Sequence, residues 1–205
     1  MKQNKYQTGY NTRSLLQKEF DAVLNSVSSI NSFIRGKEKI KLDVIPVNSE
    51  QSKKWISGEV LKRARVLSKP VFFELYRDAD ENDKTLILFY AVCKTYQLIP
   101  DFIIDTVLRK WYNLDHELSS YDFKSFIFRI SEQHPELADM SEKNLSNTAA
   151  ATLKILREVG ILRGDKLVKR EFNPRILNEI VGNGDSWFLE VLLLNETERQ
   201  EIIGR

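Results

Sequence analysis

The chain has 205 residues, of which 42% are hydrophobic and 29% charged, with a formal net charge of +2. This composition fits a folded protein with a buried core and excludes a disordered or collagen-like chain. The single cysteine, Cys93, excludes an intrachain disulfide, and the polar N-terminal residues lack the apolar run of a signal peptide. No stretch approaches the ~20 apolar residues of a membrane span, so we expect a cytoplasmic protein without membrane contact.

The first third of the chain is predicted to be mostly helical. After about ten residues that look like an arm, Asn11 or Thr12 is expected to cap a helix. Its apolar residues recur at helical spacing: Leu15, Leu16, Phe20, Val23 and Leu24. A short helix is expected over 30–34, a short strand or extended loop over 39–45, and a longer helix over 49–67.

The longer helix carries a local excess of positive charge. Between Gln51 and Pro70 six basic residues accompany one acid, Glu59, although the whole chain is nearly neutral. Positive charge gathered on one face, rather than a high net charge, is the electrostatic footprint of nucleic-acid binding. We therefore expect phosphate contacts from Lys53, Lys54, Lys62, Arg63 and Arg65.

The centre of the chain is the most hydrophobic part and is predicted to be helical core. Aromatic and aliphatic side chains recur at helical spacing on both sides of Pro100, which fits only the first turn of a helix. Ser119 and Asp122 have the spacing of a capping box at the start of the next helix. Apolar stripes of this kind normally fill an interior, so we expect a core, with Cys93 inside it, rather than a cofactor pocket.

The segment from Ser141 to Arg175 has the most specific pattern. A helix is expected over 147–159, ended by Gly160, and Gly164-Asp165 suits the two-residue turn of a β-hairpin. Asn173-Pro174 then supplies an N-cap and a first-turn proline for another helix. Helices followed by a hairpin in this order are typical of a winged helix-turn-helix.

In a winged helix-turn-helix one helix enters the major groove of DNA, and we expect the hairpin, or wing, to lie on a phosphate strand. From Lys143 to Arg175 basic residues outnumber acids by eight to three. Hydrogen bonds to DNA are expected from short polar side chains near the start of the helix: Ser146, Asn147, Thr148 and Thr152. Phosphate contacts are expected from Lys154, Arg157, Arg163, Lys166, Lys169 and Arg170.

Patterns for catalysis or metal binding are missing from the sequence. It has no Gly-rich phosphate loop, no paired cysteines and no Gly-x-Ser-x-Gly motif, and His116 and His134 are isolated. We therefore expect no enzyme activity, no catalytic or metal-binding residues, no cofactor and no small-molecule substrate.

From about Lys84 to Val181 the sequence resembles the BrxA family, whose members are small components of BREX phage-defence systems. The resemblance rests on Leu98-Ile99-Pro100-Asp101-Phe102, on Leu145-Ser146-Asn147-Thr148 and on the run from Leu153 to Leu162. It implies a helical protein with helix-turn-helix-like parts that binds double-stranded DNA, lacks catalytic residues and acts beside other BREX components.

These observations together predict an all-α, mainly helical fold with a winged-helix-like C-terminal part that carries a short β-hairpin. Three parts are expected: a helical part over 1–76, a helical core over 77–135 and the winged-helix-like part over 136–205. The leading functional hypothesis is non-enzymatic binding of double-stranded DNA. A protein-interaction adaptor within the defence complex and an RNA-binding helical protein stay open as alternatives.

Overall fold

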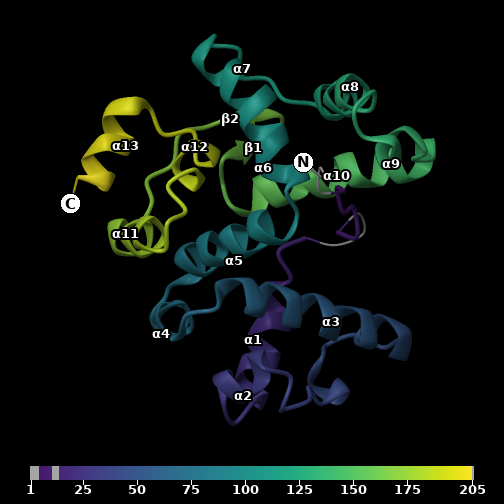
Figure 1. Cartoon of the computed structure of the whole chain (residues 1–205), viewed down its shortest axis with the longest axis vertical. Coiled ribbons are helices and arrows are strands. Elements are labelled where there is room, and N and C mark those ends of the chain that lie inside the picture. Colours follow the sequence, from purple (N-terminus) through teal and green to yellow (C-terminus); the bar gives the residue numbers. More distant parts are fainter. Residues whose placement is uncertain (1–4, 11–13, 205) are drawn as a thin grey trace. The chain divides into compact units, whose positions relative to one another are not determined.

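The computed structural model describes residues 5–10 and 14–204 (Figure 1). Within these ranges the protein is mainly helical, with one short two-stranded antiparallel sheet, so the predicted fold class is confirmed. The chain forms two compact units, which we call the N-terminal unit (Leu15–Thr95) and the C-terminal unit (Met1–Ser14 with Tyr96–Arg205). The three-part division expected at 1–76, 77–135 and 136–205 stays a prediction.

The N-terminal unit is built around its last helix. Its elements are α1 (Gln17–Ser26), α2 (Ile30–Ile34), the 3-10 turn η1 (Leu42–Val44), α3 (Glu50–Leu67), α4 (Pro70–Asp78) and α5 (Glu81–Thr95). Every residue from Leu86 to Cys93 is buried, and α1, α3 and α4 all contact α5. A helix that is apolar on all sides must be covered on all sides, which explains its central place. The prediction that Cys93 is a core residue is confirmed, and burial raises the pKa of its thiol.

The predicted helices of this unit are found. The expected cap residues Asn11 and Thr12 lie outside the described residues, and α1 begins after Leu16, whose φ is +60°. Of the short strand or extended loop expected over 39–45, the structure has the extended loop, which ends in the turn η1. Its side chains alternate between exposed and partly or fully buried, but a strand also needs a neighbouring strand to pair its backbone groups, and within the described residues none pairs with this segment.

The C-terminal unit starts with three consecutive helical segments: α6 (Leu98–Phe102), the π-helical turn η2 (Ile103–Val107) and α7 (Leu108–Tyr112). The remaining elements are α8 (Ser120–Ile130), α9 (Pro135–Ala138), α10 (Glu142–Glu158), β1 (Leu162–Arg163), β2 (Lys166–Leu167), α11 (Pro174–Gly182), α12 (Phe188–Val191) and α13 (Glu196–Ile203). Helix α8 packs on α10, and Phe102 contacts Phe123 and Phe126 of α8 in the core.

Two tyrosines of the N-terminal arm pack against this unit: Tyr10 lies in its core, and Tyr6 is partly buried at its surface. Tyr10 is buried, and its hydroxyl lies 3.2 Å from the Thr152 hydroxyl on α10. The Tyr6 hydroxyl donates to the Asp101 carboxylate at 2.7 Å, and its backbone N–H donates to Glu136 at 2.9 Å. The described part of the arm therefore packs against the C-terminal unit.

Two predicted helix starts in the C-terminal unit are confirmed. Ser119 and Asp122 form the capping box of α8, and Asn173 caps α11 with Pro174 in the first turn. Within the ranges given above, no single helix is both long and apolar enough to cross a membrane.

Candidate nucleic-acid interface

The hairpin of β1 and β2 places two basic side chains toward solvent. Leu162 pairs with Leu167 and Arg163 with Lys166, and the turn between them contains Gly164 with φ +59°, as the sequence predicted. Both leucines are buried, whereas both basic side chains are exposed. Like charges directly opposite each other on a hairpin are unfavourable, and neither side chain makes an ion pair within the described ranges. The hairpin therefore displays two adjacent positive charges that an anion would stabilise.

A third extended segment supports the hairpin. Glu117 forms a backbone bridge with Lys166, the Leu167 N–H donates to the His116 carbonyl at 2.7 Å, and the Leu118 N–H donates to the Asp165 carbonyl at 2.8 Å. Because Leu118 is buried, this segment anchors the hairpin to the core of the unit. The exposed Glu117 is the acid nearest in register to the two basic side chains.

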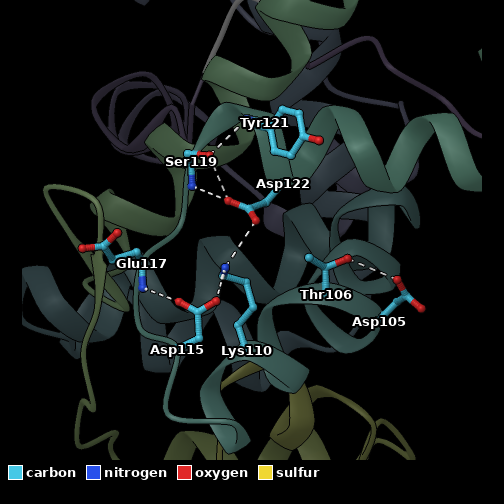
Figure 2. Close-up of polar contacts among 8 residues, drawn as sticks. All are labelled: Asp105, Thr106, Lys110, Asp115, Glu117, Ser119, Tyr121 and Asp122. Carbon is cyan, nitrogen blue, oxygen red and sulfur yellow. Dashed lines mark hydrogen bonds and ion pairs between the residues drawn. The ribbon is translucent and has the colours of Figure 1, made fainter.

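The segment before this bridge is fixed by a lysine between two carboxylates (Figure 2). The Lys110 ammonium lies 2.5 Å from Asp115 and 3.3 Å from Asp122, and Asp122 also accepts from the Ser119 N–H at 2.7 Å. Asp115 in turn accepts from the Glu117 N–H at 3.3 Å. The Lys110 hydrogen bond holds the pKa of Asp115 below its usual range. Although desolvation acts in the opposite direction, the two carboxylates raise the pKa of Lys110.

We expect a Lys110→Met variant to loosen the base of the hairpin. Without the ammonium, the Asp115 and Asp122 carboxylates lose their shared partner, and the backbone bond from the Asp115 N–H to the Lys110 carbonyl remains as the tie to α7. The Leu118 and Leu167 amides should therefore exchange with solvent faster. NMR-detected hydrogen exchange measures the rates of these two amides, with Lys124→Met on α8 as the control.

The carboxyl pKa of Asp115 should rise toward its ordinary value in the Lys110→Met variant. In the wild type the ion pair should weaken as the pH falls through the lowered pKa of Asp115, since the charged form is then lost. Unchanged exchange of both amides would contradict this role.

Helix α10 begins earlier than the sequence predicted. It starts at Glu142 and is capped by Ser141, whose side chain accepts from the Asn144 N–H, so the expected start at 147 is wrong. Asp and Glu are common in the first turn of a helix, and Ser141-Glu142 was the available signal for this start. Ser146, Asn147 and Thr148 therefore lie in the second turn and not at the N-terminus.

Two threonines expected to contact DNA are instead buried. Thr148 and Thr152 are 0% exposed, and their hydroxyls donate to the carbonyls of Asn144 and Thr148, at 2.8 and 2.9 Å. Ser146 and Asn147 are partly buried. Helical periodicity places Thr148 and Thr152 on the buried face with Ile155 and Leu156, wherever the helix starts.

The exposed face of α10 is defined by residues at intervals of three and four: Lys143, Asn147, Ala150, Lys154 and Arg157. All except the partly buried Asn147 are exposed. Lys143 and Ala150 were not among the predicted contacts, although they share this face. The small side chain of Ala150 at the middle of the face lets another surface approach the helix closely.

Three of the predicted basic residues have partners in the C-terminal unit. Arg157 donates to the Gly164 carbonyl at 2.8 Å and to the Asp165 carboxylate at 2.9 Å, so it joins α10 to the hairpin turn. Lys154 lies 3.8 Å from Glu158. Lys169 forms an exposed ion pair with Glu198. Exposed pairs contribute little stability, so Lys154 and Lys169 remain able to exchange their partner for a phosphate.

Arg170 has a different environment. Its guanidinium donates to the carbonyl of Val159, the residue that ends α10, and lies 5.3 Å from the centre of the Phe172 ring. Gly160 has φ +82°, and a Cβ there would lie 3.2 Å from Arg170. These contacts make Arg170 a cap of the helix end, which leaves it less available to DNA than the sequence suggested.

The basic residues of α3 are not equivalent either. Lys54 is exposed and has no ion pair within the described ranges. Lys53 lies 3.1 Å from Glu50, Lys62 lies 2.6 Å from Glu59, and the exposed Arg65 donates to the Ile34 carbonyl at 3.0 Å.

Arg63 cannot contact DNA in this conformation. It is 0% exposed, and its guanidinium donates to the Leu15 carbonyl at 2.5 Å. In the sequence Arg63 was grouped with its basic neighbours, but helical periodicity places it on the same side as Ile56, Val60 and Leu67, all buried.

Comparison with known proteins agrees with this fold. The family model described as BrxA matches residues 4–183. A protein named "BREX protein BrxA" from Bacillus cereus (strain H3081.97) is 25% identical over 198 residues, covering 94% of this chain and 98% of its own length. A crystal structure of an uncharacterized protein from Magnetospirillum magneticum is similar with a TM-score of 0.73 and 17% identity, covering 92% of this chain and 98% of that one. Because the family match spans most of the sequence, the chain belongs to the BrxA family.

Proposed function

We propose that this protein is a non-enzymatic, double-stranded DNA-binding component of a BREX phage-defence system. The observation that carries the DNA-binding part is the outward-facing pair of Arg163 and Lys166, which are cross-strand neighbours without an ion pair within the described ranges. The name of the Bacillus cereus relative supports the place in a BREX system. The other components of such a BREX system are the expected protein partners.

The arrangement around the hairpin supports a winged helix-turn-helix mode of binding. In this proposal the exposed face of α10 enters the major groove, where Ala150 allows a close approach, and the hairpin lies on the adjacent phosphate strand. Arg157 bonds to the hairpin turn and so fixes the wing relative to the helix within one unit.

Binding is proposed to tolerate many sequences. Phosphate contacts carry no sequence information, and bases are read by side chains that reach the base edges. Asn147, the amide on the exposed face of α10 that could read adenine in a bidentate manner, is partly buried. Lysine and arginine can read guanine in the same way, but Lys154 and Arg157 are paired with Glu158 and Asp165, and we assign the basic residues of this face to phosphates. Of the predicted contacts in this unit we therefore retain Ser146, Asn147, Lys154, Arg157, Arg163, Lys166 and Lys169, and we add Lys143. Thr148, Thr152 and Arg63 are removed from the set because they are buried.

A salt series with a fluorescent duplex of arbitrary sequence tests this function. We expect the logarithm of the binding constant to fall linearly with the logarithm of salt concentration, since each neutralised phosphate releases counterions. With about six phosphate contacts, affinity should drop roughly a thousandfold between 50 and 200 mM salt. Single-stranded DNA and RNA should compete poorly. No duplex binding at 50 mM salt would reject the proposal, and stronger competition by RNA would favour the RNA-binding alternative.

The adaptor alternative also has an observation in its favour. Tyr121 and Phe128, two turns apart on α8, are 76% and 83% exposed. Exposed aromatic residues are enriched at protein interfaces and costly to leave in water. A stable complex with another BREX component that excludes DNA would support this reading, and it should weaken in a Tyr121→Ser/Phe128→Ser variant that still binds duplex DNA.

A further inference from the structure

A basic loop in the N-terminal unit, residues 35–41, lies outside the helix that sequence analysis selected for DNA contact. Four of its seven residues are basic and exposed: Arg35, Lys37, Lys39 and Lys41. The loop connects the end of α2 to the turn η1 and lies near Arg65 of α3, which donates to the Ile34 carbonyl. Within the described ranges, the side chains of Arg35, Lys37 and Lys39 have no ion pair.

The single acid of the loop, Glu38, is bonded to the segment before α2, and its one negative charge is outnumbered by the four basic side chains. The Glu38 carboxylate accepts from the Ser28 N–H at 2.7 Å, the Ser28 hydroxyl at 3.0 Å and the Ser29 N–H at 3.0 Å. These bonds satisfy the backbone just before α2 and hold the pKa of Glu38 below its usual range, with Lys41 adding a smaller attraction. Glu38 therefore shapes the loop and leaves the exposed side to the cations.

The start of the loop is also fixed by backbone contacts. The N–H groups of Gly36 and Lys37 donate to the carbonyls of Phe33 and Ser32, at 2.9 and 2.8 Å. Gly36 has φ +70°, and a Cβ there would lie 3.2 Å from the Arg65 guanidinium. Residues with a side chain rarely adopt this φ, so glycine allows the tight turn that brings the loop beside Arg65. A loop held in this way loses little entropy when its side chains bind.

We propose that residues 35–41, together with Arg65, form a second phosphate-binding surface that contacts the backbone of double-stranded DNA. The proposal rests on the proposed function and adds a contact surface to it. Lys37, Lys39 and Lys41 are exposed while Glu38 and Ile40 are partly buried, so every second side chain points outward. Residues 37 and 38 form a bend, so the spacing of an extended chain, about 6.6 Å between alternate residues, applies from Lys39 to Lys41. Phosphates along one DNA strand recur every ~3.4 Å of helix axis, so several lysines can each reach a phosphate at once.

The test compares two double variants of the full chain with equal change of charge. Lys37→Gln/Lys39→Gln removes two charges from the loop. Lys18→Gln/Lys69→Gln removes two exposed charges elsewhere in the same unit. Lys41 is left intact because it attracts Glu38. Duplex binding is measured across a salt series, and thermal unfolding shows that each variant folds.

The loop variant should bind on the order of tenfold more weakly at 0.1 M salt, and its salt slope should fall by about 2. The control variant should bind like the wild type. Equal binding by the loop variant and the wild type would overturn the proposal, as would equal losses in both variants, which indicate a net-charge effect. Loss of binding to an acidic BREX component with unchanged DNA binding would assign the loop to a protein partner and also overturn it. An Arg163→Gln/Lys166→Gln variant separates the proposed function from the proposed second surface. If this hairpin variant loses DNA binding and the loop variant does not, the second surface is rejected and the proposed function is retained.

Discussion

An Arg163→Glu/Lys166→Glu variant is expected to bind duplex DNA on the order of a hundredfold more weakly at 0.1 M salt than the wild type. Each lost phosphate contact removes close to one unit of salt slope, and two opposite charges add repulsion from the DNA. Fluorescence anisotropy with the arbitrary duplex measures the change. The loss should shrink as salt rises, because electrostatic contacts are screened.

The fold of this variant should be little affected. The two residues face each other across the hairpin, so one pair of like charges replaces another, and the new repulsion from Glu117, which is bridged to Lys166, acts between exposed side chains. Both buried partners in the hairpin, Leu162 and Leu167, are untouched. A Lys5→Glu/Arg175→Glu variant makes the same change of net charge at two exposed sites of the same unit and should bind nearly as well as the wild type. Unchanged binding by the hairpin variant would remove the wing from the proposed interface.

Local sequence signals predicted much of the fold. Spacing of apolar residues predicted α1, α5 and α8, because a helix that covers a core must repeat its apolar residues every three to four positions. Short-range chemistry predicted the capping box at Ser119 and Asp122 and the turn at Gly164. These features depend only on neighbours in the chain, so they could be inferred without tertiary structure.

The candidate site was predicted less well because exposure depends on tertiary packing. Thr148 and Thr152 look like surface residues by type, yet they can be buried because their hydroxyls bond to carbonyls of the preceding turn. Arg63 is buried within a basic run that looks uniformly exposed. The bonds from the Ser28 and Ser29 N–H groups to Glu38, which fix the basic loop at 35–41, cannot be inferred from composition. For Arg63 and Glu38 a contact outside the local segment fixes the side chain, whereas the threonines are buried because their face of α10 packs in the core.

Replacement of Arg63 by methionine should have the largest effect on stability. We expect the Arg63→Met variant to lower the free energy of unfolding by about 3 kcal/mol, since it removes a fully buried charge from its partners and takes one donor from the Leu15 carbonyl. Methionine keeps an unbranched stem of similar length, so it limits the cavity but cannot donate to the Leu15 carbonyl. Glu59, 2% exposed and one turn earlier on α3, would also lose a nearby positive charge.

Urea unfolding at 25 °C measures the loss, and an unchanged slope against urea would show that the same structure unfolds. Arg65→Met is the matched control, because Arg65 is exposed and bonds only one carbonyl among the contacts described above; it should cost less than about 1 kcal/mol. Below the unfolding transition Arg63→Met should bind duplex DNA like the wild type, since a side chain without exposed surface cannot reach a phosphate. A variant with normal stability and weakened DNA binding would instead place Arg63 at the interface. That outcome would require α3 to rotate or open, and it would restore the original reading of the basic run as a single binding face.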